Sequence, residues 1–220
     1  MSNDVSSMLP DIPNLVRVCK AIAMLDAILC EEWEHRYYSF DSHWNKDDPS
    51  EMMASMRDGS GDHYYIWFTR QGAAIKGCAQ DSLLNPDNND GEPFPEVFAN
   101  FPNELSYFLK EAAFLISDTT FCYWRRQTDP TWNSGGIAFP KNSGADPDGS
   151  KTMLQILDGN PATYVEYAED YFEVEISEED VNHIYQLKPL NPELLIRLHC
   201  QRKLDQLTED IKEIGYIRGT

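Results

Sequence analysis

The sequence lacks the short motifs by which common catalytic and nucleotide-binding sites are recognised. It contains no GxSxG, HExxH or GxGxxG motif and no phosphate-binding loop. Its glycine cluster at Asp58–Gly61 is not followed by the Lys-Ser/Thr pair of such a loop, so we expect it to turn the chain. No motif therefore assigns this chain to an enzyme class.

Basic residues are scarce. The 220 residues include 18 Lys and Arg against 37 Asp and Glu, a formal net charge of −19. This charge opposes nonspecific binding to nucleic acid or to an anionic membrane, because both carry negative charge themselves. It favours a basic protein as the partner, although an ordinary solvated acidic surface would have the same composition.

Cysteines are few and have no CxxC spacing, which argues against a zinc knuckle or a dithiol redox motif. Three of the five, Cys19, Cys78 and Cys122, lie within apolar or aromatic patterns, so we expect buried, reduced thiols of a cytosolic protein. The five histidines have no metal-binding spacing. The sequence therefore predicts neither a metal nor a cofactor.

Long apolar runs are also missing. No stretch approaches the roughly 18 apolar residues of a membrane span. The first ten residues lack a positive region, and Arg17, Lys20 and Asp26 interrupt the apolar pattern that follows. We therefore expect no secretory signal, no membrane association and a cytoplasmic location.

What the sequence does contain is a clear β-hairpin. His63–Thr69 is aromatic and β-branched, Arg70–Gly72 offers a turn with a permissive glycine, and Ala73–Cys78 reads as the returning strand. Further strands are expected within Trp33–Trp44, over Thr119–Arg126 and at Gly136–Phe139. These elements predict an α+β fold with an antiparallel sheet of about five strands.

Helices are expected at residues 11–30 and 103–116, where apolar residues recur with helical spacing, and both are expected to pack on the sheet. Glu51–Met56 is expected to form one helical turn. From residue 150 onward, Ser150, Asn160, Ser177 and Asn191 are placed to begin helices, a short strand is expected at 171–176, and Gly215 is placed to end the last helix. We therefore expect one domain over 1–220, with a sheet-centred core at 11–149 and a mainly helical portion at 150–220.

Two loops rich in Asp, Gly and Pro carry the candidate binding residues. Neither loop fits a calcium-binding EF-hand, because the positions that require glycine and glutamate hold other residues. Exposed acids can steer a basic partner, and a nearby tryptophan can anchor it. The candidate partner-binding residues are Asp87, Asp90, Glu92, Trp132, Asp146 and Asp148.

The alternative is a small hydrolase whose carboxylates converge only in the fold. Glu31 with Glu32, and Glu166 with Glu169 and Asp170, are examples of neighbouring acids. A deep pocket that holds two carboxylates with perturbed pKa values would favour this alternative. A regulatory or structural subunit is a third possibility that the sequence does not separate from the first.

Three short stretches give the chain a family resemblance. They are Glu34–Phe40, Met56–Asp62 and Ile156–Gly159, with the helix that opens at Ser177 beyond them. Together they resemble small, acidic bacterial immunity proteins that accompany polymorphic toxins. The resemblance implies a non-enzymatic protein that neutralises a basic toxin or effector, and it assigns no functional residue.

Overall fold

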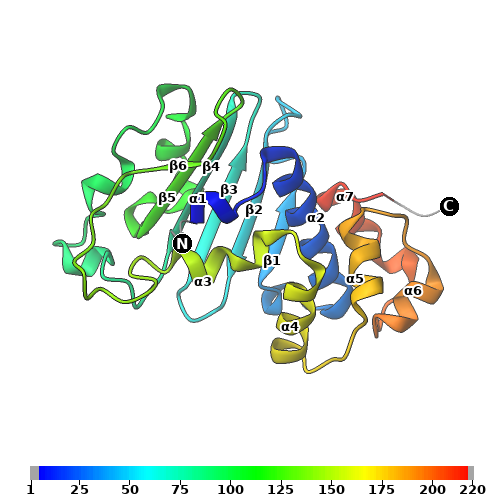
Figure 1. Cartoon of the computed structure of the whole chain (residues 1–220). Coiled ribbons are helices and arrows are strands. Elements are labelled where there is room, and N and C mark those ends of the chain that lie inside the picture. The colour runs from blue at the N-terminus through cyan, green and yellow to red at the C-terminus, as the bar shows by residue number, and fades with distance from the viewer. Residues whose placement is uncertain (1–4, 218–220) are drawn as a thin grey trace. The chain divides into compact units, whose positions relative to one another are not determined.

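The computed structural model describes residues 5–217 (Figure 1). The fold is α+β, as the sequence predicts. Its six strands form one sheet in the order β1-β2-β3-β4-β5-β6, so strands that follow one another in the chain are neighbours in the sheet. None of the helices in the described part of the chain is long and apolar enough to cross a membrane.

The chain divides into two compact units. The first, here called the sheet unit, contains the described residues up to Ile12 and Ser55–Gln155. The second, the helical unit, contains the described residues of Pro13–Ala54 and of the chain from Ile156 onward. The C-terminal helices thus share a unit with nearly all of the long helix that begins at Ile12.

The sheet unit is built on the predicted hairpin of β3 (His63–Phe68) and β4 (Gly72–Cys78), followed by β5 (Phe121–Arg126) and β6 (Asn133–Ser134). These strands pair antiparallel and lie side by side in Figure 1. Gly72 has a φ of +157°, and a Cβ there would lie 2.2 Å from the Arg125 carbonyl oxygen, so only glycine fits. The remaining elements of the unit are two helices and six 3₁₀ turns that precede β5, with these bounds: α1 Val5–Met8, η2 Pro86–Asn88, η3 Pro95–Phe98, η4 Asn103–Leu105, η5 Phe108–Lys110, η6 Ala112–Phe114, η7 Ile116–Asp118 and α3 Ser150–Leu154.

The helical unit contains nearly all of α2 (Ile12–Leu29), which confirms the predicted first helix. Leu15, Val18, Ile22 and Leu25 are buried along it, as their spacing predicts. Helices α4 and α5 lie side by side (Figure 1). The other elements are η1 Trp33–His35, β1 Tyr38–Asp41, β2 Met52–Arg57, η8 Gln155–Asp158, α4 Pro161–Tyr171, α5 Glu178–Tyr185, α6 Pro192–Arg197, η9 Leu204–Leu207 and α7 Thr208–Ile214. β2 continues from this unit into the sheet unit, and η8 begins in the sheet unit.

Three of the four predicted capping residues are confirmed, whereas Ser150 is the first residue of α3 and Gly149 is its cap. The side chains of Asn160, Ser177 and Asn191 accept hydrogen bonds from backbone N–H groups in the first turns of α4, α5 and α6. Gly215 ends α7 with a φ of +65°. These signals act within a few residues, which is why the sequence alone reveals them.

The predicted helix at 103–116 is wrong. The segment forms four short 3₁₀ turns instead, and Leu115 between the last two has a left-handed backbone with a φ of +48°. Side chains form hydrogen bonds with backbone groups of this segment. Glu111 accepts from the Ala113 N–H at 3.2 Å, and Lys76 donates to the Leu115 carbonyl at 2.8 Å. Such contacts compete with the hydrogen bonds of a continuous helix.

Three shorter predictions are also wrong. Residues 52–57 form strand β2 rather than a helical turn, since one isolated turn is too short to be stable. No strand forms at 136–139, because Gly136 has a φ of +62°, nor at 171–176, where Glu173 has a φ of +55°. The strand expected within Trp33–Trp44 is confined to β1, after the 3₁₀ turn η1.

Candidate partner-binding surface

The first predicted loop presents its acids to solvent. Asp87, Asp90 and Glu92 are all exposed. The loop is ordered by its own polar groups: the Asn85 side chain accepts from the Asp87 N–H at 3.0 Å, and Asp90 has a left-handed backbone with a φ of +55°. Three of the six candidate residues are therefore positioned where a partner can reach them.

Asp87 also lines a cavity of about 170 Å³ in the sheet unit. Asp118 lines the same cavity and accepts a hydrogen bond from the Ser117 hydroxyl at 2.9 Å. The remaining lining includes the side chains of Cys78, Gln80 and Asn85. The two carboxylates and two amides give this cavity the chemistry of a site for a cationic side chain.

The second predicted loop uses its acids internally. Asp146 and Asp148 are half-buried. The Asp146 carboxylate accepts from the backbone N–H groups of Lys151 and Thr152 at 3.0 and 2.8 Å. Asp148 accepts from the Ser150 N–H at 3.0 Å and from its hydroxyl at 2.7 Å. Burial raises the pKa of Asp148, while the Ser150 hydrogen bonds oppose that shift. Both acids thus stabilise the start of α3.

The structure brings the two predicted loops together. The Leu83 N–H and the Ser82 hydroxyl both donate to the Pro147 carbonyl oxygen, at 3.0 and 3.1 Å. This double contact joins the first loop to the second although 64 positions separate Leu83 from Pro147. The two acidic loops are therefore one continuous region of the sheet unit.

Trp132 lies inside the sheet unit. Its side chain is only 3% exposed, and its indole N–H donates to the Pro10 carbonyl oxygen at 2.7 Å. The ring therefore serves to hold the N-terminal segment of this unit. A tryptophan in a polar loop looks exposed in the sequence because the segment that covers it is 122 positions away.

The helical unit contains a second concentration of acids, none of which is among the predicted partner-binding residues. No Lys or Arg occurs between Lys151 and Lys188. Within this interval the residues of 166–179, here called the acidic segment, include seven carboxylates that are all exposed: Glu166, Glu169, Asp170, Glu173, Glu175, Glu178 and Glu179. The absence of Lys and Arg between Lys151 and Lys188 is the sequence signal that would have identified the acidic segment.

A different carboxylate, Asp26, is fully buried in the helical unit. Its oxygens accept from the Tyr38 N–H at 2.9 Å and from the Tyr164 hydroxyl at 2.7 Å. Burial raises its pKa to about 7, although both hydrogen bonds favour the ionised form. Tyr164 is also fully buried, so substrate or solvent does not reach this pair. Asp26 therefore joins α2, β1 and α4 rather than forming an open site.

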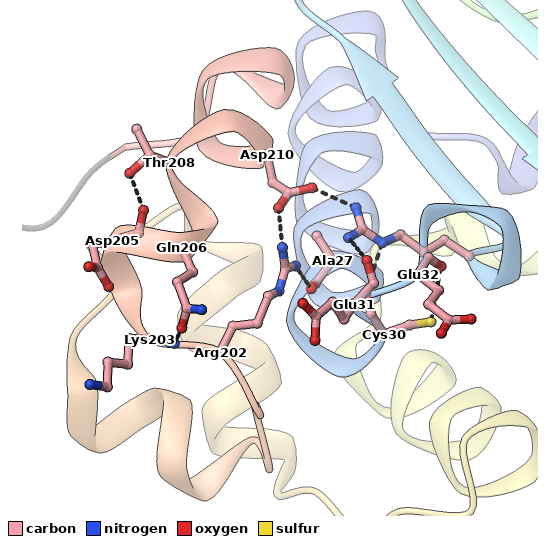
Figure 2. Close-up of polar contacts among 11 residues, drawn as sticks. Ala27, Cys30, Glu31, Glu32, Arg202, Lys203, Asp205, Gln206, Thr208 and Asp210 are labelled. Atoms are coloured by element: carbon pink, nitrogen blue, oxygen red, sulfur yellow. Dashed lines mark hydrogen bonds and ion pairs between the residues drawn. The ribbon is translucent and has the colours of Figure 1, made fainter.

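Asp210 bridges two arginines in the same unit, and Figure 2 shows this network. Its two oxygens accept from Arg36 at 2.6 Å and from Arg202 at 2.8 Å. Arg36 also donates to the carbonyls of Cys30 and Glu31, at 2.8 and 2.9 Å, and Arg202 donates to that of Ala27. The two guanidinium groups thus satisfy free carbonyls at the negative end of α2.

A second acid lies beside this network. Burial raises the pKa of Glu213, and the nearby carboxylates of Asp41 and Asp210 add to the shift. The cavity that Asp210 and Glu213 line has a volume of only about 10 Å³. That space holds about one water molecule. Glu213 and Asp210 are therefore neighbouring acids without room for a substrate, which weighs against the hydrolase alternative at this place.

The thiols of the chain show the burial that the sequence predicts. Cys19, Cys78 and Cys122 are buried and free of disulfides. Burial raises the pKa of the Cys19 and Cys122 thiols, so neither is a reactive thiolate. Within residues 5–217, no three His, Cys, Asp or Glu side chains gather as they would around a metal ion.

Comparisons with protein-family models, with curated proteins and with solved structures find no match to this chain.

Proposed function

We propose that this chain is a non-enzymatic binding protein that captures a basic protein through its exposed carboxylates. The observation that carries the proposal is the acidic segment, seven exposed carboxylates within an interval that has no Lys or Arg. Such a segment attracts a basic partner from a distance and speeds encounter, and salt weakens that attraction.

The charge balance supports the proposal independently of any single contact. Even if each of the 18 Lys and Arg residues neutralised one of the 37 acids, 19 carboxylates would have no cationic partner in the chain. Concentrated exposed charge of one sign destabilises a compact protein by self-repulsion. A basic partner would relieve this repulsion when it binds.

The sheet unit supplies a second contact region. Asp87, Asp90 and Glu92 are exposed there, and Asp87 and Asp118 line the cavity of about 170 Å³. We propose that a Lys or Arg side chain of the partner enters this cavity. The resemblance to toxin-immunity proteins makes the neutralisation of a basic toxin the specific form of the proposal.

The experiment is affinity capture from the cells that produce this protein, read by mass spectrometry. The Debye length falls from about 30 Å in 0.01 M salt to about 3 Å in 1 M salt, so the capture is carried out at both concentrations. We expect a stoichiometric basic protein that is retained at low salt and lost at high salt.

Two matched baits locate the contact. One carries Glu166→Gln, Glu169→Gln, Asp170→Asn and Glu175→Gln in the acidic segment. The other carries Asp87→Asn, Asp90→Asn, Glu92→Gln and Asp118→Asn in the sheet unit. Each removes the same number of carboxylates, so unequal loss of the partner identifies the unit that binds it. Equal capture by both variants and the unchanged chain, or no basic partner at either salt concentration, would refute the proposal.

A further inference from the structure

Lys76 is a cation in the interior of the sheet unit. It lies in the middle of β4 with an exposed fraction of 0%. Its ammonium group donates to three neutral acceptors: the His63 Nε2 atom at 2.9 Å, the Leu115 carbonyl at 2.8 Å and the Asp118 carbonyl at 3.5 Å. A buried charge is costly unless hydrogen bonds replace its water, so these acceptors are what permits its burial.

The contacts of His63 fix the positions of its protons. The Nε2 atom accepts from Lys76, so in the neutral ring the proton is on Nδ1, which donates to the Gly61 carbonyl at 2.9 Å. Both ring nitrogens of His63 are therefore engaged in hydrogen bonds. A second proton can enter only at Nε2, and it would remove the lone pair to which Lys76 donates.

The third member of the cluster is the turn at residues 115–118. Leu115 holds a left-handed backbone that is costly for a bulky residue, and its side chain is 43% exposed. Lys76 binds the carbonyl groups at both ends of this turn. Phe114, next to Leu115, is fully buried and packs near the Tyr65 and Phe108 rings. The turn therefore keeps an unfavourable conformation while Lys76 holds it.

We propose that His63, Lys76 and the turn at 115–118 form an acid-sensitive latch. A proton that binds the His63 Nε2 atom in acid removes one acceptor of Lys76 and places two cations in contact. The ammonium group then withdraws, the Leu115 carbonyl loses its donor, and residues 103–118 open. This inference concerns the sheet unit itself and does not depend on the proposed binding of a basic protein.

The charged neighbours set the direction of the response. Burial and then the Lys76 charge lower the pKa of His63, while Asp118 and Asp62 act in the opposite sense. Burial also lowers the pKa of Lys76 to about 8, against smaller opposing effects of Cys78, Asp118 and Cys122. The Tyr65 ring, 5.6 Å from the ammonium nitrogen, is neutral in this range. Because the folded surroundings lower the pKa of His63 below the ordinary histidine value of 6.5, this residue takes up a proton more readily in the opened segment, so its protonation in acid favours opening.

The test is hydrogen exchange of residues 103–118 in the full chain at neutral and mildly acidic pH, corrected for the intrinsic pH dependence of exchange. We expect protection of this segment to fall about tenfold or more in acid. His63→Gln offers an amide oxygen as acceptor but cannot take up a proton, so its protection should not depend on pH. His35→Gln replaces an exposed histidine and should behave like the unchanged chain.

Two results would overturn the proposal. One is unchanged protection of residues 103–118 in acid, and the other is the same acid response in His63→Gln as in the unchanged chain. Should His63→Gln fail to fold, an NMR titration of the unchanged chain decides instead. The Leu115 and Asp118 amide resonances must then shift together with the His63 ring, and independent titration would refute the latch.

Discussion

The sheet unit buries a cation, whereas the helical unit buries anions. Lys76 is surrounded by neutral acceptors, namely an imidazole nitrogen and two carbonyl oxygens. Asp26 is surrounded by donors, a backbone N–H and a tyrosine hydroxyl. In both places hydrogen bonds to uncharged groups replace water, and in both the charged residue joins segments that are distant in the chain.

The two buried groups should respond to pH with opposite signs. The pKa of Asp26 is raised from 3.8 to about 7, so its contribution to stability is present in acid and is lost as the pH rises through about 7. The pKa of Lys76 is lowered from 10.5 to about 8. Between these two values Lys76 is more fully protonated in the unfolded chain than in the folded one, so its contribution to stability rises with pH. The comparison teaches that the sign of a buried charge decides the direction of the pH response.

The largest expected effect comes from removing a carboxylate that pairs with two buried arginines of the helical unit. Asp210→Ala leaves Arg36 and Arg202, whose side chains are only 8% and 10% exposed, without their shared counter-ion. Removal of one partner from a buried ion pair costs about 3–5 kcal/mol. We expect the free energy of unfolding from urea denaturation to fall by that amount. Asp205→Ala, an exposed acid near the same helix, is the control and should change it by less than about 0.5 kcal/mol.

The next prediction tests the pH response of the helical unit. Asp26→Asn keeps the acceptor for one hydrogen bond but points an NH₂ group at the donor of the other, which should cost about 1–3 kcal/mol. The variant also removes the ionisable group, so the loss of stability between pH 4 and pH 7 that Asp26 causes should disappear. Urea denaturation at several pH values measures both effects. An unchanged pH dependence would show that Asp26 does not titrate as described.

The smallest effect concerns exposed charge. Glu178 and Glu179 lie in the first turn of α5, where carboxylates favour the positive end of the helix. We expect Glu178→Gln and Glu179→Gln each to lower the free energy of unfolding by about 0.3–1 kcal/mol at low salt. Glu175→Gln, outside the helix, is the matched control. A loss as large as that of Asp210→Ala would remove the distinction between buried and exposed charge.

Local signals made much of the fold predictable from the sequence. The hairpin, the first helix and the helix starts at Asn160, Ser177 and Asn191 depend on residues a few positions apart. The segment at 103–116 was predicted wrongly because Lys76, from a different element, binds its backbone. Periodicity within a segment does not report such a contact.

The candidate surface was predictable only in part. Asp87, Asp90 and Glu92 are exposed as expected in a turn-rich loop, but Asp146 and Asp148 are engaged by the amides that begin α3. An acid in a loop can either face solvent or stabilise a helix start, and composition does not distinguish these roles.

The most direct test of the binding proposal is the salt dependence of affinity for the captured basic partner, measured by calorimetry. For the unchanged chain, we expect affinity to fall at least about tenfold as the Debye length shortens from about 30 to about 3 Å. The variant with four neutralised acids in the acidic segment should bind more weakly at low salt and depend less on salt. Affinity that is independent of salt, and equal in the two proteins, would contradict the claim that exposed carboxylates are the binding feature.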